Sequence, residues 1–163
     1  MKLNLQDIIE RPGANKSFQF LLNVQGLSFA QVKEMPETMP VQGVVRNIAG
    51  ALELSGKMQV NMTCICDRCI APIQVAYTLP LKAYLAEMLV DEENPDIFLI
   101  KDGLVDLDEV CKTIFALSMD SKSLCRDDCA GLCSRCGANL NDGACVCEKE
   151  IDPRLEALRQ LLE

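Results

Sequence analysis

Polar and apolar residues alternate along much of the first half of the chain. A period of two residues is typical of a strand with one buried face. The stretches 41–48, 51–65 and 72–85 read in the same extended way. The clearest alternation places Gln19 and Asn23 between the apolar residues Phe18, Phe20, Leu22 and Val24. The pattern predicts an antiparallel sheet or a partly open barrel over residues 17–85.

Glycine and proline indicate where the chain turns. Gly50 and the Ser55–Gly56 pair are expected to mark turns or bulges between strands. Residues 1–16 are mostly polar, and Pro12–Gly13 predicts a turn within them. This segment is therefore expected to be a polar lead-in to the sheet.

The apolar period changes to that of a helix after residue 106. Asp106 is the expected N-cap, with Glu109 as the reciprocal partner of a capping box. The residues expected to face the core from this helix are Leu107, Val110, Cys111, Ile114 and Leu117. A short last helix is predicted after Asp152–Pro153, with an apolar stripe of Leu155, Leu158, Leu161 and Leu162.

Composition divides the 163 residues into two parts. Hydrophobic residues make up 49% of the chain, which indicates a folded protein, but residues 120–150 contain few aliphatic side chains and six cysteines. Such a segment cannot bury an apolar core, so something else must organise it. We expect an α+β fold with residues 1–119 as the sheet domain and residues 120–163 as a small cysteine-rich zinc-binding module that ends in a helix.

Charge narrows the classes of partner. The net charge of −8 disfavours sequence-independent binding to bare nucleic acid and fits a basic protein, although a local basic patch would still attract RNA. Residues 86–109 carry nine carboxylates. This stretch is either a solvated loop or a docking surface for a basic partner. The IFLI run at 97–100 within it predicts a short strand.

The sequence also indicates a compartment. The first residues, MKLNLQDIIERPG, lack the apolar core of an export signal, and no apolar run approaches the roughly 18 residues of a membrane span. We expect a cytoplasmic protein whose ten cysteines stay reduced. The chain has no histidine, so catalysis through imidazole is excluded and any transition-metal site must use thiolates or carboxylates.

Six cysteines near the C-terminus have the spacing of a metal site. They follow the pattern C-x3-C-x3-C-x2-C-x8-C-x-C, as Cys125, Cys129, Cys133, Cys136, Cys145 and Cys147. A C-x-x-C turn lets two thiolates reach one tetrahedral ion. The preferred ligand set is Cys133, Cys136, Cys145 and Cys147, and Cys125 and Cys129 either replace one pair or join a two-metal cluster. Free thiols, disulfides and an iron–sulfur cluster are the alternatives.

The expected cofactor is zinc in a structural role. A catalytic zinc ion keeps an open position for water, whereas an excess of thiolates closes the coordination shell. No other catalytic arrangement is apparent, because the carboxylates lie in a loop-like run without the convergence that magnesium needs. The sequence therefore predicts a protein that is not an enzyme and has no small-molecule substrate.

A second cysteine motif lies at residues 64–69, with the sequence CICDRC. Cys64, Cys66 and Cys69 supply at most three thiolates, so a complete site would need a further ligand such as Cys111. The alternatives are a structural turn with buried thiols, a metal site and a redox pair, although the helix N-terminus that activates redox cysteines is missing. Arg68 would contact either an RNA phosphate or a carboxylate.

Together these motifs resemble the YceD family, the large ribosomal RNA subunit accumulation proteins. The resemblance runs in order along most of the chain, from about residue 3 to 162. Its residues are Cys66-Asp67-Arg68-Cys69, Val105-Asp106-Leu107, Leu124-Cys125, Cys129-Ala130-Gly131-Leu132-Cys133, Cys136-Gly137-Ala138-Asn139-Leu140-Asn141, Cys145-Val146-Cys147 and Asp152-Pro153-Arg154-Leu155.

The resemblance implies a bacterial cytosolic factor for 23S rRNA accumulation and large-subunit assembly. Its partner would be ribosomal RNA or a basic ribosomal protein, with no role at a membrane. Direct RNA contacts would fall to the cations Arg46, Lys57, Arg68, Arg126 and Arg135, with the acidic stretch turned away. The competing hypotheses are a thiol redox protein or redox-sensing switch and, less well supported, a metal-dependent nuclease or hydrolase.

Overall fold

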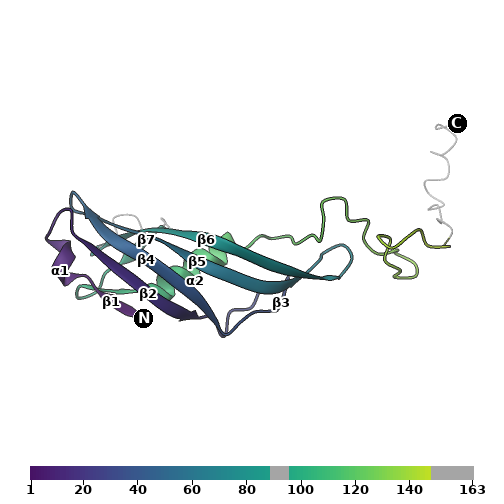
Figure 1. The fold of residues 1–163 in the computed structure, drawn as a ribbon, viewed down its shortest axis with the longest axis horizontal. Coiled ribbons are helices and arrows are strands. Elements are labelled where there is room, and N and C mark those ends of the chain that lie inside the picture. The colour runs from purple at the N-terminus through teal and green to yellow at the C-terminus, as the bar shows by residue number, and fades with distance from the viewer. Residues whose placement is uncertain (89–95, 148–163) are drawn as a thin grey trace, which may run out of the picture.

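The computed structural model describes residues 1–88 and 96–147. Four long strands build a twisted sheet that runs along the long axis of the molecule, and the segment after α2 extends beyond its end (Figure 1). In chain order the elements are β1 (Lys2–Asn4), α1 (Gln6–Ile9), β2 (Asn15–Asn23), β3 (Val32–Glu34), β4 (Thr38–Ile48), β5 (Ala51–Ile65), β6 (Pro72–Ala86), β7 (Ile97–Leu99), β8 (Leu104–Asp106) and α2 (Leu107–Ser118).

The main sheet has the strand order β2-β4-β5-β6-β7, and β3 pairs separately with β5. All pairings are antiparallel except that of β6 with β7. Within the described residues β2 and β7 do not pair with each other, so the sheet stays open. The predicted α+β fold with an antiparallel sheet is therefore confirmed, and the barrel is not closed.

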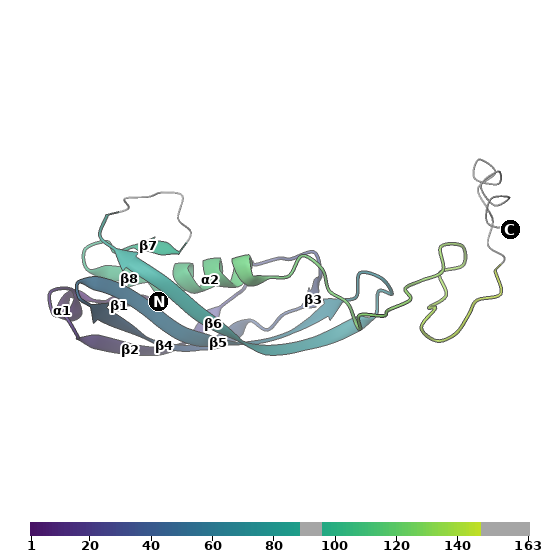
Figure 2. The same cartoon turned by 90° about the horizontal axis from the view of Figure 1, so that it is seen from above.

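The sheet has one covered and one bare face. Residues at alternate positions of the long strands point into a core of aliphatic and methionine side chains, as the period-two pattern predicts. Helix α2 closes this core, with Phe115 fully buried edge-to-face against Phe29 at a ring distance of 5.6 Å. In Figure 2, α2, β7 and β8 lie on one side of the long strands, and no element of the described chain covers the other side.

Two expectations about turns and the N-terminus are wrong. Strand β5 runs through Ser55–Gly56 without a turn, and Gly56 pairs with Gly43 of β4. The two glycines allow the strands to approach, since a Cβ at Gly56 would lie 2.6 Å from the Gln42 carbonyl oxygen. The N-terminal segment forms β1 and α1 and buries Leu3, Leu5 and Ile8. Both elements are too short to produce a readable period.

Helix α2 begins where the sequence predicts but faces the core differently. The side chain of Asp106 accepts a hydrogen bond from the backbone N–H of Asp108 at 3.0 Å, so it is the N-cap. Among the described residues no bond returns from Glu109, so the capping box is incomplete. Leu117 is expected to face the core but is 66% exposed, and Phe115 is buried there instead. The predicted last helix, residues 152–162, lies outside the described residues.

The buried Asn47 fastens α1 to the sheet. Its amide nitrogen donates hydrogen bonds to the carbonyl oxygens of Ile8 and Ile9 at 2.8 and 2.7 Å, and its oxygen accepts from the Gly50 N–H at 2.8 Å. Replacing Asn47 with alanine should lower the free energy of unfolding by about 2–4 kcal/mol, because buried partners lose their hydrogen bonds. Urea denaturation would measure this. A loss below about 0.5 kcal/mol, as for a surface position, would contradict the assignment.

Candidate metal centres

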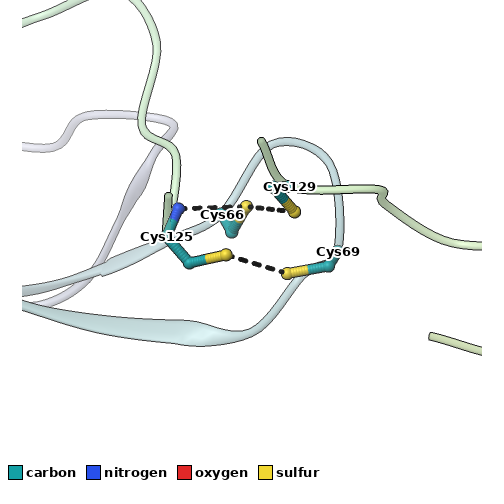
Figure 3. A group of neighbouring side chains, drawn as sticks. All are labelled: Cys66, Cys69, Cys125 and Cys129. Atoms are coloured by element: carbon teal, nitrogen blue, oxygen red, sulfur yellow. Dashed lines mark hydrogen bonds between the residues drawn. The ribbon is translucent and has the colours of Figure 1, made fainter. Parts of the chain in front are cut away.

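Four cysteines from two distant segments meet at the tip of the β5–β6 hairpin. Cys66 and Cys69 come from the turn between β5 and β6, and Cys125 and Cys129 come from the segment after α2. Figure 3 shows the four sulfur atoms pointing toward one another. The Cys66–Cys129 and Cys69–Cys125 Sγ atoms are 3.8 and 3.7 Å apart, and all four lie within 4.8 Å of one another.

These distances fit a single tetrahedral ion. Zinc–sulfur bonds of about 2.3 Å place the sulfur atoms of a tetrahedral site about 3.8 Å apart. A cluster of several iron atoms would hold its thiolates farther apart, because an inorganic core lies between them. Cys66, Cys69 and Cys129 are buried. We call this group the hairpin centre.

A second group of four thiols lies farther along the chain. The Sγ atoms of Cys133, Cys136, Cys145 and Cys147 are also all within 4.8 Å of one another. None of these residues is buried. All four come from one stretch of 15 residues without a helix or strand. We call this group the C-terminal centre, and its donor set is again four thiolates.

Both centres contain the same backbone turn. In the first, the Ile70 N–H donates to the Cys66 carbonyl and the Cys66 N–H donates to the Ala71 carbonyl, each at 2.9 Å. In the second, the Gly137 N–H donates to the Cys133 carbonyl at 2.9 Å and the Cys133 N–H donates to the Ala138 carbonyl at 2.8 Å. Residues 66–71 and 133–138 also share the sequence C-x-R-C-x-A. The chain therefore repeats one ligand-presenting turn.

The repeated turn requires a left-handed residue after its second cysteine. Gly137 adopts φ of 71° at this position without cost, whereas Ile70 adopts 61°. A β-branched residue there costs roughly 1–3 kcal/mol and needs surrounding contacts to hold it. The hydrogen bond from the Ile70 N–H to the Cys66 carbonyl helps to hold Ile70 in this conformation.

Backbone N–H groups favour the thiolate form at the first cysteine of each turn. At Cys66 burial opposes ionisation, but the N–H groups of Cys69, Cys125 and Arg68 outweigh it and lower the thiol pKa to about 6. At Cys133 the N–H groups of Cys136 and Arg135 lower the pKa to about 6. The backbone of each turn thus favours the thiolate form that a metal ion binds.

Crowding of sulfur atoms has the opposite effect on other members of the centres. The side chain of Cys129, followed by burial, raises the pKa of Cys125 to about 12. The side chain of Cys136, followed by burial, raises the pKa of Cys147 to about 12. Four thiolates at these distances repel one another, and a divalent cation in their midst offsets that repulsion. The electrostatics of both groups thus suit a cation.

Hydrogen bonds fasten the segment after α2 to the hairpin tip. The Asp67 N–H donates to the Ser123 carbonyl at 2.9 Å, and the Ser123 N–H donates to the Asp67 carboxylate at 2.7 Å. The Arg68 guanidinium donates to the carbonyl oxygens of Asp127 and Cys129 at 3.2 and 2.9 Å. One terminal nitrogen of Arg68 is therefore engaged within the protein, a role that sequence reasoning did not foresee.

Asn141 connects the two centres. It lies between the cysteine pairs of the C-terminal centre, yet its amide nitrogen donates to the Cys129 sulfur at 3.4 Å. Its oxygen accepts from the Ala130 N–H at 2.8 Å and from the Arg126 guanidinium at 2.7 Å. The hydrogen bond from Asn141 lowers the pKa of Cys129. Outer contacts of this kind orient a ligand and tune it.

The structure sorts the predicted ligands in an unexpected way. The preferred set of four C-terminal cysteines comes together, but Cys125 and Cys129 join Cys66 and Cys69. Cys64 and Cys111 are buried in the sheet core and belong to neither centre. Cys111, the example given above of a further ligand for the first motif, lies apart from that motif because α2 holds it inside the core, where burial raises its pKa to about 12.

The fold and the two centres define a class of protein: an open antiparallel sheet with two four-cysteine groups, each of which could hold a metal ion. The chain belongs to the family described as large ribosomal RNA subunit accumulation protein YceD, whose sequence model matches residues 54–162. That range includes β6, α2 and the cysteines of both centres.

Individual relatives carry no functional description. Uncharacterized proteins of Mycobacterium bovis and of two Mycobacterium tuberculosis strains are each 29% identical to this chain over 124 residues. The match covers 72% of this chain and 59% of each relative, so the chain spans about three fifths of the length of these curated proteins. No solved structure matches the chain. No helix in the described residues is long and apolar enough to cross a membrane.

Proposed function

We propose that this protein is a non-enzymatic, cytoplasmic factor that supports accumulation of 23S rRNA and assembly of the large ribosomal subunit. The observation that carries the proposal is the family match over residues 54–162. The family name implies a role in the accumulation of large-subunit rRNA. Binding of rRNA or of a basic ribosomal protein is the finer step that we add.

Zinc is the metal that we assign to both centres. Four thiolates at tetrahedral spacing form the closed coordination shell of a structural zinc ion, which leaves no position for a reacting water. In the hairpin centre the ion would link residues 66–69 to residues 125–129. In the C-terminal centre it would organise a segment that lacks an apolar core. The zinc ions would thus shape the end of the molecule for binding.

Depletion of the protein from its host bacterium tests the proposal. We expect the ratio of 23S to 16S rRNA to fall and free large subunits to become scarce in sucrose gradients, with restoration by the wild-type gene. Unchanged rRNA ratios and subunit profiles after depletion would overturn the proposed role.

The redox alternative predicts a different result. If Cys66 and Cys69 were a redox pair, the zinc-loaded wild type would exchange thiols rapidly with a small disulfide reagent. A protein with both cysteines replaced by serine would then lose this exchange. The zinc hypothesis expects the zinc-loaded wild type to exchange slowly at these two cysteines, because coordination ties up their thiolates. The family match lends no support to the redox alternative.

A further inference from the structure

The bare face of the sheet carries a charge opposite to that of the chain. Residues at alternate positions of β2, β4, β5 and β6 point away from the core, and no described element covers them (Figure 2). The chain has 24 acidic and 16 basic residues, yet these four strands contain Glu53 as their sole carboxylate against Lys16, Arg46, Lys57 and Lys82. Lys16 pairs with Asp7, and the other three cations are exposed on the bare face.

The strand register groups these cations. Arg46 is paired with Glu53, and Glu53 with Tyr84, across β4, β5 and β6. Lys57 of β5 and Lys82 of β6 are diagonal neighbours in adjacent rows of the sheet. The backbones of such diagonal neighbours lie about 7–8 Å apart. No ion pair joins Arg46, Lys57 or Lys82 to a carboxylate of the described residues. Their charges therefore remain available to a ligand.

The remaining groups on this face suit a nucleic acid. A shallow, wide-open depression lies where Gly43 and Gly56 bring β4 and β5 together. Tyr84 is 54% exposed and presents an aromatic ring beside the cations. Aromatic rings on exposed sheets stack with unpaired bases, and amides bond to bases and sugars. The uncharged polar residues of the face include Ser17, Gln19, Gln42, Ser55, Gln59 and Thr78.

Apart from Glu53, the acidic residues of the described chain lie outside these four strands. Asp102, Asp106 and Asp108 belong to the β7–β8–α2 region, on the opposite side of the long strands in Figure 2. A basic ribosomal protein would be repelled by the bare face and attracted to that region, whereas RNA has the reverse preference. Charge complementarity thus selects RNA for the bare face.

We infer that the bare face of β2, β4, β5 and β6 is an RNA-binding surface that holds single-stranded rRNA through Arg46, Lys57 and Lys82. This inference rests on the proposed role in 23S rRNA accumulation and names the partner and the surface. On this inference the two cysteine centres do not bind the RNA themselves but stabilise the end of the same sheet.

Charge reversal on this face tests the inference with the full-length, zinc-loaded protein and an in vitro 23S rRNA transcript as probe. The R46E/K57E/K82E variant should bind the transcript at least about 100-fold more weakly at 0.1 M salt, and its plot of log K against log salt should be shallower by about 2–3. The matched control, K2E/K33E/K101E, changes three exposed lysines outside this face by the same total charge. Its affinity should stay within about threefold of the wild type, because distant exposed charges are screened.

A gain-of-binding variant makes the test sharper. E53Q removes the face's sole carboxylate and should tighten binding about two- to tenfold, since it lies beside Arg46 and is diagonal to Lys82. Equal weakening by both triple variants, or no effect of R46E/K57E/K82E, would overturn the RNA surface. The inference would also be overturned if the wild-type protein did not bind the transcript and bound a basic ribosomal protein instead.

Failure of this inference can be told apart from failure of the proposed function. If depletion lowers 23S rRNA and the R46E/K57E/K82E variant restores it fully, the role in rRNA accumulation is supported and the assignment of the RNA-binding surface is contradicted. If depletion leaves 23S rRNA unchanged while the triple variant loses transcript binding, the RNA-binding surface is supported and the proposed role in rRNA accumulation is contradicted. Circular dichroism of the variants would verify that the sheet remains folded.

Discussion

On the proposed assignment of zinc to both centres, replacing Cys66 with serine should lower the zinc content of the purified protein from two ions per chain to one. Cys66 is fully buried, and its Sγ lies 3.8 Å from that of Cys129. A structural zinc site contributes apparent binding free energy of about 10–16 kcal/mol at pH 7, and loss of one of its four thiolates weakens the site. The segment after α2 would then lose its attachment. Mass spectrometry under native conditions would count the ions.

The expected local effect is fast hydrogen exchange at the hairpin tip. The amides of Asp67 and Ser123 bond across the two segments, as does the Leu132 amide to the Arg68 carbonyl. These amides should lose protection in the Cys66→Ser protein while the long strands keep theirs.

The matched control is Cys133→Ser in the C-terminal centre. It should also retain one ion but leave the amides of Asp67 and Ser123 protected. Two ions in the Cys66→Ser protein, or identical exchange patterns in the two variants, would contradict the division into two centres.

Truncating Phe115 should produce the largest loss of stability among changes to α2. Its ring is fully buried and packs edge-to-face on Phe29. Removal of a buried aromatic side chain costs about 3–5 kcal/mol, a large part of the roughly 5–15 kcal/mol by which a domain is stable. Urea denaturation of the Phe115→Ala protein, compared with the wild type, should show this decrease.

Leu117 provides the control on the same helix. It is two residues away and 66% exposed, so Leu117→Ala should change the unfolding free energy by no more than about 0.5 kcal/mol. Comparable losses in the two variants would mean that the face of α2 toward the sheet has been wrongly assigned.

The sheet could be predicted because its period is long and regular. β4, β5 and β6 each have between 11 and 15 residues, which gives the alternation many repeats to read. β1, α1 and β8 have three or four residues, and their burial depends on contacts with segments remote in sequence. Such elements cannot be inferred from local pattern. The same limit applies to Phe115 and Leu117, because only tertiary packing decides which of the two side chains is buried.

The C-terminal centre could be inferred from spacing, since its ligands are neighbours along the chain. The hairpin centre could not, because its two halves are brought together by the fold of the intervening residues. One feature of the sequence does point to it. The turn at Cys66–Ala71 repeats the C-x-R-C-x-A pattern of Cys133–Ala138, so the two motifs deserve the same interpretation. The contact of Asn141 with Cys129 leaves no comparable trace in the sequence.

The sequence separation within each centre determines how much of the chain must fold before a metal ion could bind there. The C-terminal ligands are close along the chain, so an ion can assemble them as soon as the last has left the ribosome. Cys66 and Cys129 are 63 residues apart. In an unstructured chain, closing this longer loop costs roughly 1 kcal/mol more than closing the short one. Prior folding of β5, β6 and α2 removes that cost, so an ion in the hairpin centre would join the segment after α2 to a sheet that has already folded, whereas the C-terminal centre could assemble without the sheet.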